Sequence, residues 1–169
     1  NYYVVIDSKM PKERIGHILD IIKPQMLIMG AECEGRLSEY RDRCEFVSME
    51  ELLHSSINHR ILSDIRREQI DTDILYVLFT SGSTGKPKGT VINHRNVLSY
   101  SKWYCDRFTI NDNTVSANQT PFYFSMSVSD IYSVVRGAGT LHIIPKKLFS
   151  FPITLLNFLN DKGVNTIYW

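Results

Sequence analysis

The residues with the clearest chemical potential form a short run of glycine, hydroxyl and lysine side chains. The run reads Ser81-Gly82-Ser83-Thr84-Gly85-Lys86-Pro87-Lys88-Gly89. Glycine lets backbone N–H groups approach an anion closely. Serine and threonine supply short hydroxyl donors, and lysine supplies positive charge. This combination predicts a loop that binds phosphate.

The loop must be held by the element before it, the apolar run of residues 74–79, which predicts a buried strand. A flexible Gly/Ser linker needs neither that strand nor a Lys-Pro-Lys-Gly ending. The P-loop of kinases and GTPases is excluded because Pro87 stands where that loop has the hydroxyl that holds Mg²⁺. A dinucleotide-binding loop is excluded because the chain contains no G-x-G-x-x-G.

Residues 76–89 resemble the phosphate loop of the acyl-adenylate-forming (AMP-binding) superfamily, which includes acyl-CoA synthetases, luciferases and the adenylation domains of nonribosomal peptide synthetases. Residues 2–7 are similar to the family's AYVPID segment. Residues 121–132 are similar to its F-D-x-S-V-x-[DE]-I segment, which lines the substrate pocket. Residues 99–103, with 130–132, most resemble the stand-alone D-alanine:carrier-protein ligases and related amino acid adenylation domains. The resemblance spans nearly the whole chain.

This resemblance implies ATP-dependent activation of a carboxylic acid, an amino acid or a related acid, as an acyl-adenylate with release of pyrophosphate. The acyl group would then pass to the phosphopantetheine thiol of a carrier protein. Two alternatives stay open: an acyl-CoA synthetase, in which coenzyme A accepts the acyl group, and a non-catalytic nucleotide-binding module. ATP and Mg²⁺ are the implied cofactors.

The resemblance also assigns roles to individual residues. The β- and γ-phosphates of ATP are expected to contact Thr80, Ser81, Gly82, Ser83, Thr84, Gly85 and Lys88. The substrate pocket is expected to include Phe124, Ser125, Met126, Ser129 and Tyr168. No catalytic residue and no metal ligand is expected in the chain, because the family's Mg²⁺-binding acid and catalytic lysine come later than Trp169.

One pocket residue departs from the family pattern. Amino-acid-activating members place Asp directly after the position of Phe124, where it pairs with the substrate's α-ammonium; this chain has Ser125. A buried ammonium without a partner is costly. Either the substrate has no α-ammonium, as in a hydroxy, keto or aryl acid, or an acid outside the chain takes over. Asp130 is not a substitute, because the family has its own acid there and we expect it to cap a helix with Ser127.

The composition is that of a globular protein, with 169 residues, 43% hydrophobic and 22% charged. A net charge of +1 gives no reason to expect nucleic acid or a membrane as partner. Cys33, Cys44 and Cys105 form no C-x-x-C pair, so we expect free thiols in the cytoplasm. The histidines show no metal-ligand spacing.

Asn1 and Trp169 both fall in strand-like segments. We therefore expect residues 1–169 to be a truncated piece of the N-terminal AMP-binding adenylation domain, without the C-terminal subdomain. Such a piece is expected to form no adenylate by itself.

Helix and strand patterns alternate, which predicts an α/β fold: a layered, largely parallel sheet flanked by helices, forming part of the N-terminal (large) subdomain. Helices are expected to begin near Pro11, Ser48, Asn93, Ser127 and Pro152, with Glu51 completing a capping box at Ser48. Strands are expected at 26–29, 74–79, 90–92, 114–118, 140–144 and 164–169. Residues 31–45 are expected to be a charged surface segment. The polar, charged stretch 58–73 leads into the strand at 74–79. The helix after Asn93 is expected to bury Val97, Tyr100, Tyr104 and Phe108.

Overall fold

The computed structural model describes residues 1–80 and 87–169. The chain forms two compact units, which we name after their longest helices. The α1 unit comprises Ile6–Ile70 and Phe79–Thr90, and the α5 unit comprises Asn1–Val5, Asp71–Leu78 and Val91–Trp169. Each unit has its own hydrophobic core. In the described ranges no helix is long and apolar enough to cross a membrane.

The α1 unit begins with helix α1 (Lys12–Ile22), which ends just before Pro24, as predicted. Strands β1 (Met26–Met29) and β2 (Glu45–Ser48) pair in parallel. Side chains on β1 alternate, so Leu27 and Met29 pack on the core while Met26 and Ile28 remain half exposed. The expected strand is confirmed, but it is not buried on both faces, because a two-stranded sheet has only one face against the core.

The segment between β1 and β2 contributes more to the core than its charge suggested. It folds into three short helices, η1 (Ala31–Cys33), α2 (Glu34–Leu37) and η2 (Ser38–Tyr40). Leu37 and Tyr40 from this segment are buried against α1. The charged residues around them lie on the surface, as expected.

Two further helices follow in the α1 unit. Helix α3 (Met49–His54) begins with the predicted capping box: the Glu50 N–H donates to Ser48 Oγ, and the Ser48 N–H donates to Glu51 Oε2. Helix α4 (His59–Glu68) lies within the polar, charged stretch before β3, for which no element was predicted. Its first turn is capped by Asn58, whose Oδ1 accepts the Ile61 N–H at 3.1 Å.

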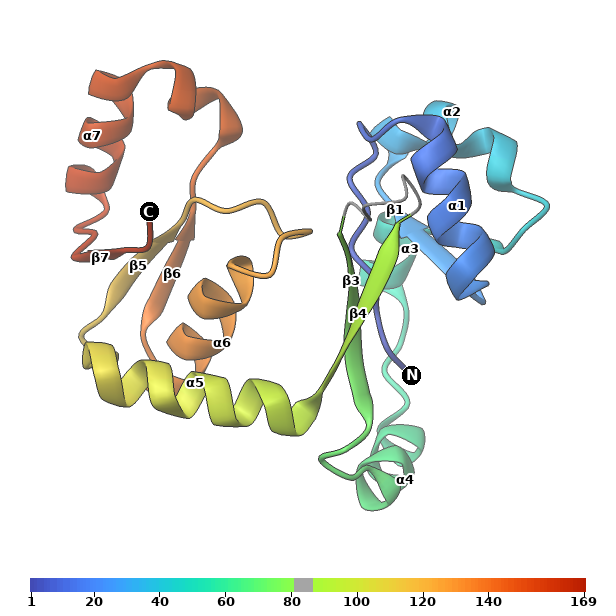
Figure 1. Cartoon of the computed structure of the whole chain (residues 1–169), viewed down its shortest axis with the longest axis horizontal. Coiled ribbons are helices and arrows are strands. Elements are labelled where there is room, and N and C mark those ends of the chain that lie inside the picture. The colour runs from blue at the N-terminus through green and yellow to red at the C-terminus, as the bar shows by residue number, and fades with distance from the viewer. Residues whose placement is uncertain (81–86) are drawn as a thin grey trace. The chain divides into compact units, whose positions relative to one another are not determined.

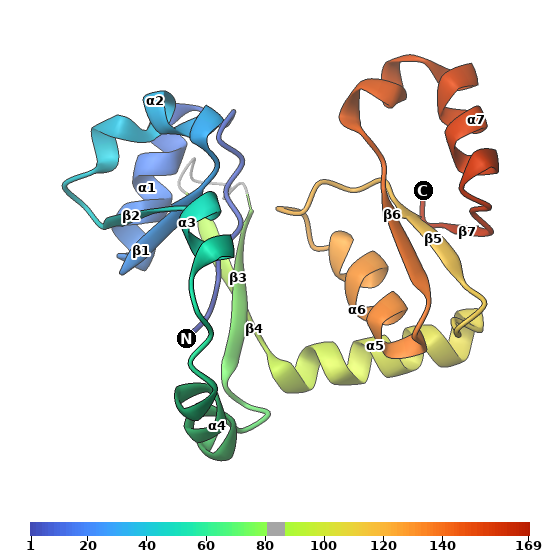
Figure 2. The same ribbon diagram turned by 180° about the vertical axis from the view of Figure 1, so that it is seen from behind.

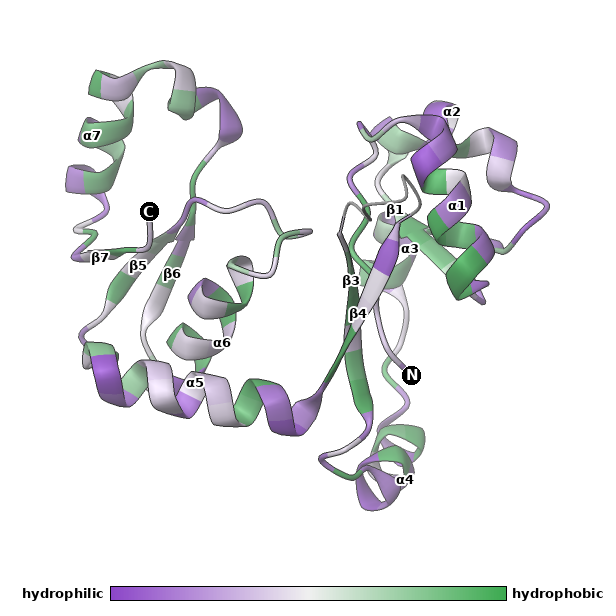
Figure 3. Ribbon diagram, viewed as in Figure 1, coloured by the Kyte–Doolittle hydropathy of each residue, from purple (hydrophilic) through white to green (hydrophobic). Residues whose placement is uncertain are grey.

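Strands β3 (Ile74–Thr80) and β4 (Lys88–Asn93) are neighbours in a two-stranded sheet. Figure 3 shows that β3 is hydrophobic over most of its length. Within the α5 unit, Tyr76 and Leu78 of β3 form a core with Val97. The N-terminal segment adds to this strand through a parallel bridge between Tyr3 and Tyr76.

The α5 unit also contains a three-stranded parallel sheet in the order β6 (Thr140–Ile143), β5 (Val115–Asn118), β7 (Thr166–Ile167). Helices α6 (Ser127–Gly137) and α7 (Pro152–Asp161) lie on opposite sides of it (Figures 1 and 2). Ala117 of β5 packs with Leu155 of α7, and the next residue, Asn118, contacts α6. The turn η3 (Lys146–Ser150) connects β6 to α7. The α/β class and the parallel pairing are confirmed, in small separate sheets.

Helix α5 (His94–Phe108) has the expected N-cap, because Asn93 Oδ1 accepts the Asn96 N–H at 2.8 Å. Val97 and Tyr104 are buried as predicted, whereas Tyr100 and Phe108 are partly exposed. Leu156 of α7, next to the buried Leu155, is also exposed. These errors share one cause: helical spacing identifies a stripe, but the neighbouring elements decide how much of its width is covered.

Candidate functional site

The two ends of the phosphate loop lie side by side in the α1 unit. Thr80 is the last residue of β3 and Lys88 is the first residue of β4. The Thr80 hydroxyl donates to the Lys88 carbonyl oxygen at 3.5 Å, which ties the base of the loop together. The other predicted phosphate ligands, Ser81, Gly82, Ser83, Thr84 and Gly85, lie outside the described residues.

At the end of the loop, Lys88 offers a positive charge to an anionic ligand. Lys88 is exposed beside the buried Pro87, so its ammonium group is available to solvent next to the loop. A lysine ammonium at such a place suits the phosphates of ATP. Within residues 1–80 and 87–169, no group of three His, Cys, Asp or Glu side chains could hold a metal ion.

The predicted pocket residues belong to the α5 unit, where residues 121–126 lead from β5 into α6. The Phe124 N–H donates to the Pro121 carbonyl at 2.9 Å, and the Ser127 hydroxyl donates to the Phe124 carbonyl at 2.7 Å. Phe124, Ser125 and Met126 are exposed on this turn. The turn therefore presents three of the five predicted pocket side chains to a ligand.

The capping box predicted for Ser127 and Asp130 is wrong. Helix α6 begins at Ser127 itself, with Met126 in the cap position and no side-chain cap. The Ser127 hydroxyl is already used by the Phe124 carbonyl. Asp130 points into the fold instead, and its Oδ2 accepts the Asn118 amide at 2.7 Å.

Asp130 is only 4% exposed, and this burial raises the pKa of its carboxyl group to about 6, while the hydrogen bond from Asn118 acts in the opposite direction. The pair joins the first turn of α6 to the end of β5. In α/β proteins, ligands bind beyond the carboxyl ends of parallel strands. The buried pair thus fixes the predicted pocket segment at the end of the sheet where binding is expected.

Ser129 is not available to a substrate in this structure. It is 3% exposed, and its Oγ lies 2.6 Å from the hydroxyl of Tyr100 on α5. Sequence reasoning missed Tyr100, which it treated as a core residue. The available signal was the phenol itself: a buried Tyr hydroxyl needs a polar partner, and the following segment is rich in serine.

Tyr168, the fifth predicted pocket residue, lies near the same helix. Its ring centroid is 6.5 Å from that of Tyr104, which in turn is 5.9 Å from that of Tyr100. Another contact holds the middle of α6, because the hydroxyls of Tyr3 and Tyr132 are 2.9 Å apart. Burial raises the pKa of the Tyr3 phenol, so this phenol is neutral near pH 7.

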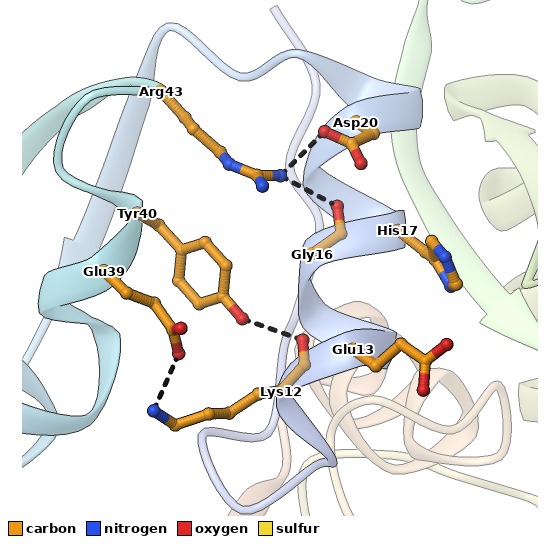
Figure 4. A pocket seen from close by; sticks show the side chains of 8 residues that line it. All are labelled: Lys12, Glu13, Gly16, His17, Asp20, Glu39, Tyr40 and Arg43. Carbon is orange, nitrogen blue, oxygen red and sulfur yellow. Dashed lines mark hydrogen bonds and ion pairs between the residues drawn. The ribbon is translucent and has the colours of Figure 1, made fainter.

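A cavity of about 300 Å³ lies in the α1 unit and includes none of the predicted site residues (Figure 4). Four of its charged groups form two ion pairs: Lys12 with Glu39 at 2.9 Å, and Arg43 with Asp20 at 2.7 Å. The Tyr40 hydroxyl donates to the Lys12 carbonyl. This arrangement joins α1 to the segment before β2.

Comparison with known families agrees with the resemblance found in the sequence. The model of the AMP-binding enzyme family matches residues 1–169. The chain therefore belongs to the AMP-binding enzyme family.

Among individual relatives, the D-alanine--D-alanyl carrier protein ligase of Lacticaseibacillus casei (strain BL23) is 32% identical over 163 residues. That match covers 96% of this chain and 31% of the ligase, so the chain spans about a third of the length of this relative.

Solved structures share the fold. The Vibrio cholerae adenylation domain AlmE, in complex with glycyl-adenosine-5'-phosphate, has a TM-score of 0.79 at 19% identity. The match covers 98% of this chain and 35% of AlmE. McyG A-PCP, complexed with phenylalanyl-adenylate, has a TM-score of 0.78 at 19% identity, and the match covers 98% of this chain and 27% of McyG. The same fold thus occurs in proteins with a small and with a large acyl group.

Proposed function

We propose that the chain is part of an ATP-dependent ligase that activates a carboxylic acid as an acyl-adenylate and releases pyrophosphate. The observation that carries this proposal is the family match over residues 1–169, which includes both the loop and the pocket segment. In this proposal residues 1–169 are part of the N-terminal adenylation domain and form no adenylate by themselves.

In the proposed reaction, a substrate carboxylate oxygen attacks the α-phosphorus of ATP, and the bond to pyrophosphate breaks. MgATP supplies the adenylyl group and the leaving group. Thr80, the loop residues 81–85 and Lys88 hold the β- and γ-phosphates, on which negative charge develops. Donors that are already oriented stabilise this charge without reorganisation, and such terms are often large.

The acid is proposed to lie against Phe124, Ser125, Met126 and Tyr168. Because Ser125 is neutral and exposed, it offers a hydroxyl but no charge to an α-ammonium. The buried Asp130 is bonded to Asn118 and does not supply that charge. The substrate is therefore an acid without an α-ammonium, or an amino acid whose ammonium binds an acid outside residues 1–169.

The proposed acceptor is the phosphopantetheine thiol of a carrier protein in the cytoplasm. The names of the similar ligases support a carrier protein over free coenzyme A, and the free thiols of Cys33, Cys44 and Cys105 agree with a reducing compartment. Incubating the complete ligase and ATP with either a phosphopantetheinylated carrier or coenzyme A separates the two acceptors, because only one should become acylated.

ATP–pyrophosphate exchange by the complete ligase tests the activation step. With its preferred acid the enzyme should incorporate labelled pyrophosphate into ATP. Lys88→Ala should lower kcat/KM for ATP by about 10-fold or more, whereas Lys162→Ala, at an exposed lysine after α7, should leave it unchanged. Formation of ADP instead of AMP, or no exchange with any acid, contradicts the proposal.

A further inference from the structure

We propose that Tyr100, a residue outside the pocket segment, takes the place in the acid pocket that resemblance assigned to Ser129, and that its ring limits the size of the acid. This inference rests on the proposed function. It concerns specificity, so the ligase can activate an acid whether or not Tyr100 has this role.

The first step is the burial of Ser129. With 3% of its surface exposed, the side chain cannot touch a bound acid. Its hydroxyl is hydrogen-bonded to the phenol of Tyr100 at 2.6 Å. A small residue such as serine would leave space for the acid at position 129, but the side chain of Tyr100 fills that space.

The second step is the exposure of Tyr100. The residue is 37% exposed although its hydroxyl reaches the buried Ser129, so the ring extends from the interior of the α5 unit to its surface. Its neighbours on α5 support the ring, with centroid distances of 5.8 Å to Trp103 and 5.9 Å to Tyr104. Tyr104 is buried and its ring also contacts that of Tyr168, which is itself a predicted pocket residue.

The third step concerns the cost of moving the ring. An acid with a long side chain at this place must displace the phenol, which breaks its hydrogen bond to Ser129 and leaves a buried hydroxyl without a partner. The packing against Trp103 and Tyr104 would be lost as well. The structure therefore favours an acid with a short side chain.

Pyrophosphate exchange by the complete ligase with two homologous series tests the inference. One series runs from glycine and alanine to norleucine, and the other from acetate to hexanoate. The measured quantity is kcat/KM for the longest acid divided by that for the shortest, within the series that is active. Tyr100→Ala should raise this ratio at least about 10-fold, the scale on which pocket size discriminates methylene groups.

Two matched variants separate ring volume from the hydrogen bond. Tyr100→Phe keeps the ring and loses the hydroxyl, and Ser129→Ala removes the partner, so both should keep the wild-type size ratio within about threefold. Thermal unfolding checks that each variant is folded. If Tyr100→Ala does not fold, Tyr100→Leu should give a smaller increase of the ratio in the same direction.

The possible outcomes are distinct. An active, folded Tyr100→Ala or Tyr100→Leu enzyme with an unchanged size ratio overturns the inference and leaves the proposed function intact. A shift of the ratio by Ser129→Ala as large as that by Tyr100→Ala also overturns it, because Ser129 would then be the determinant. If the wild-type enzyme exchanges pyrophosphate with no acid, the proposed function fails and this inference fails with it.

Discussion

The α1 unit and the α5 unit differ in the polar side chains that they bury. Among the described residues, every buried Ser, Thr, Asn and Asp lies in the α5 unit. In the α1 unit, charged groups pair at the surface, as Lys12 does with Glu39, over an apolar core centred on Ile15 and Leu19. Burying a polar group is costly unless it is bonded, so the polar interior of the α5 unit requires a reason other than stability.

These buried polar groups hold the predicted pocket segment in place. The buried Asn118–Asp130 pair, the Tyr100–Ser129 pair and the Ser127 hydroxyl all bind the first turn of α6 or the residues before it. Hydrogen bonds between buried groups have strict geometry and therefore fix one arrangement. The interior of the α1 unit therefore mainly stabilises the fold, whereas the polar groups inside the α5 unit orient the predicted pocket segment.

The largest expected effect on stability lies in the apolar core of the α1 unit. Ile15 is 1% exposed, and Ile15→Ala should lower the free energy of unfolding by about 3 kcal/mol, because it leaves a cavity. Urea titration followed by far-UV circular dichroism measures this. Ile21→Ala on the exposed side of the same helix should change stability by no more than about 0.5 kcal/mol.

The same substitution also tests whether the units are independent. Trp103 and Trp169, the two tryptophans of the chain, both belong to the α5 unit, so tryptophan fluorescence reports on that unit. Ile15→Ala should shift the dichroism transition more than the fluorescence transition. Equal shifts of the two transitions would show that the two units unfold together and do not differ in stability.

The second effect is a pH dependence that belongs to the α5 unit. The folded pKa of Asp130, about 6, exceeds its ordinary value of 3.8, so the folded state holds the proton more tightly. The contribution of Asp130 to stability is therefore full below the ordinary value and is lost as the pH rises through about 6. Tyr104, the other titratable group that interacts with it, is neutral in this range because its pKa is raised to about 12.

Asp130→Asn measures this contribution. The unfolding free energy of the wild type minus that of the variant should rise by an amount on the order of 2 kcal/mol between pH 7.5 and pH 4. Asp161→Asn, at an exposed carboxylate, is the matched control and should show a much smaller change. A difference that stays flat with pH would mean that Asp130 is solvated when the protein is folded.

A third, smaller effect compares helix caps. Asn93→Ala should destabilise the α5 unit by about 1 kcal/mol, because the Asn96 N–H loses its acceptor. Asn93→Asp, which keeps an acceptor oxygen, should retain most of that stability. The readout is the urea midpoint from tryptophan fluorescence. Equal loss in both variants would indicate that the amide has another role.

The smallest effect is expected at the surface of the α1 unit. Glu39→Gln removes the ion pair between Glu39 and Lys12. Because both side chains are largely exposed, the free energy of unfolding should fall by at most about 0.5 kcal/mol. This loss should disappear in concentrated salt, because exposed charges are screened. A loss above about 1 kcal/mol that persists in salt would show that surface ion pairs, and not only the apolar core, stabilise the α1 unit.

Local features could be predicted because their physics is local. The Ser48–Glu51 capping box and the Asn93 cap involve backbone groups two or three residues away, so the order of residues identifies them. Gly163, which comes shortly after α7, takes a positive φ of 62°, a conformation that glycine commonly adopts at the end of a helix. The capping box predicted at Ser127 failed because each side chain had a tertiary alternative, the Phe124 carbonyl for Ser127 and the Asn118 amide for Asp130.

The sequence by itself determined the family and the α/β class, and it predicted a phosphate loop and a pocket segment. These signals are local, because they consist of glycines, hydroxyls and strand patterns that follow one another along the chain. Only the tertiary structure decided which pocket side chains remain accessible. Tyr100 and Ser129 are 29 residues apart and meet because α5 lies against α6, and no local pattern encodes a contact between two helices. Burial depends on what packs against a residue, so a site is specified fully only after the elements have been packed.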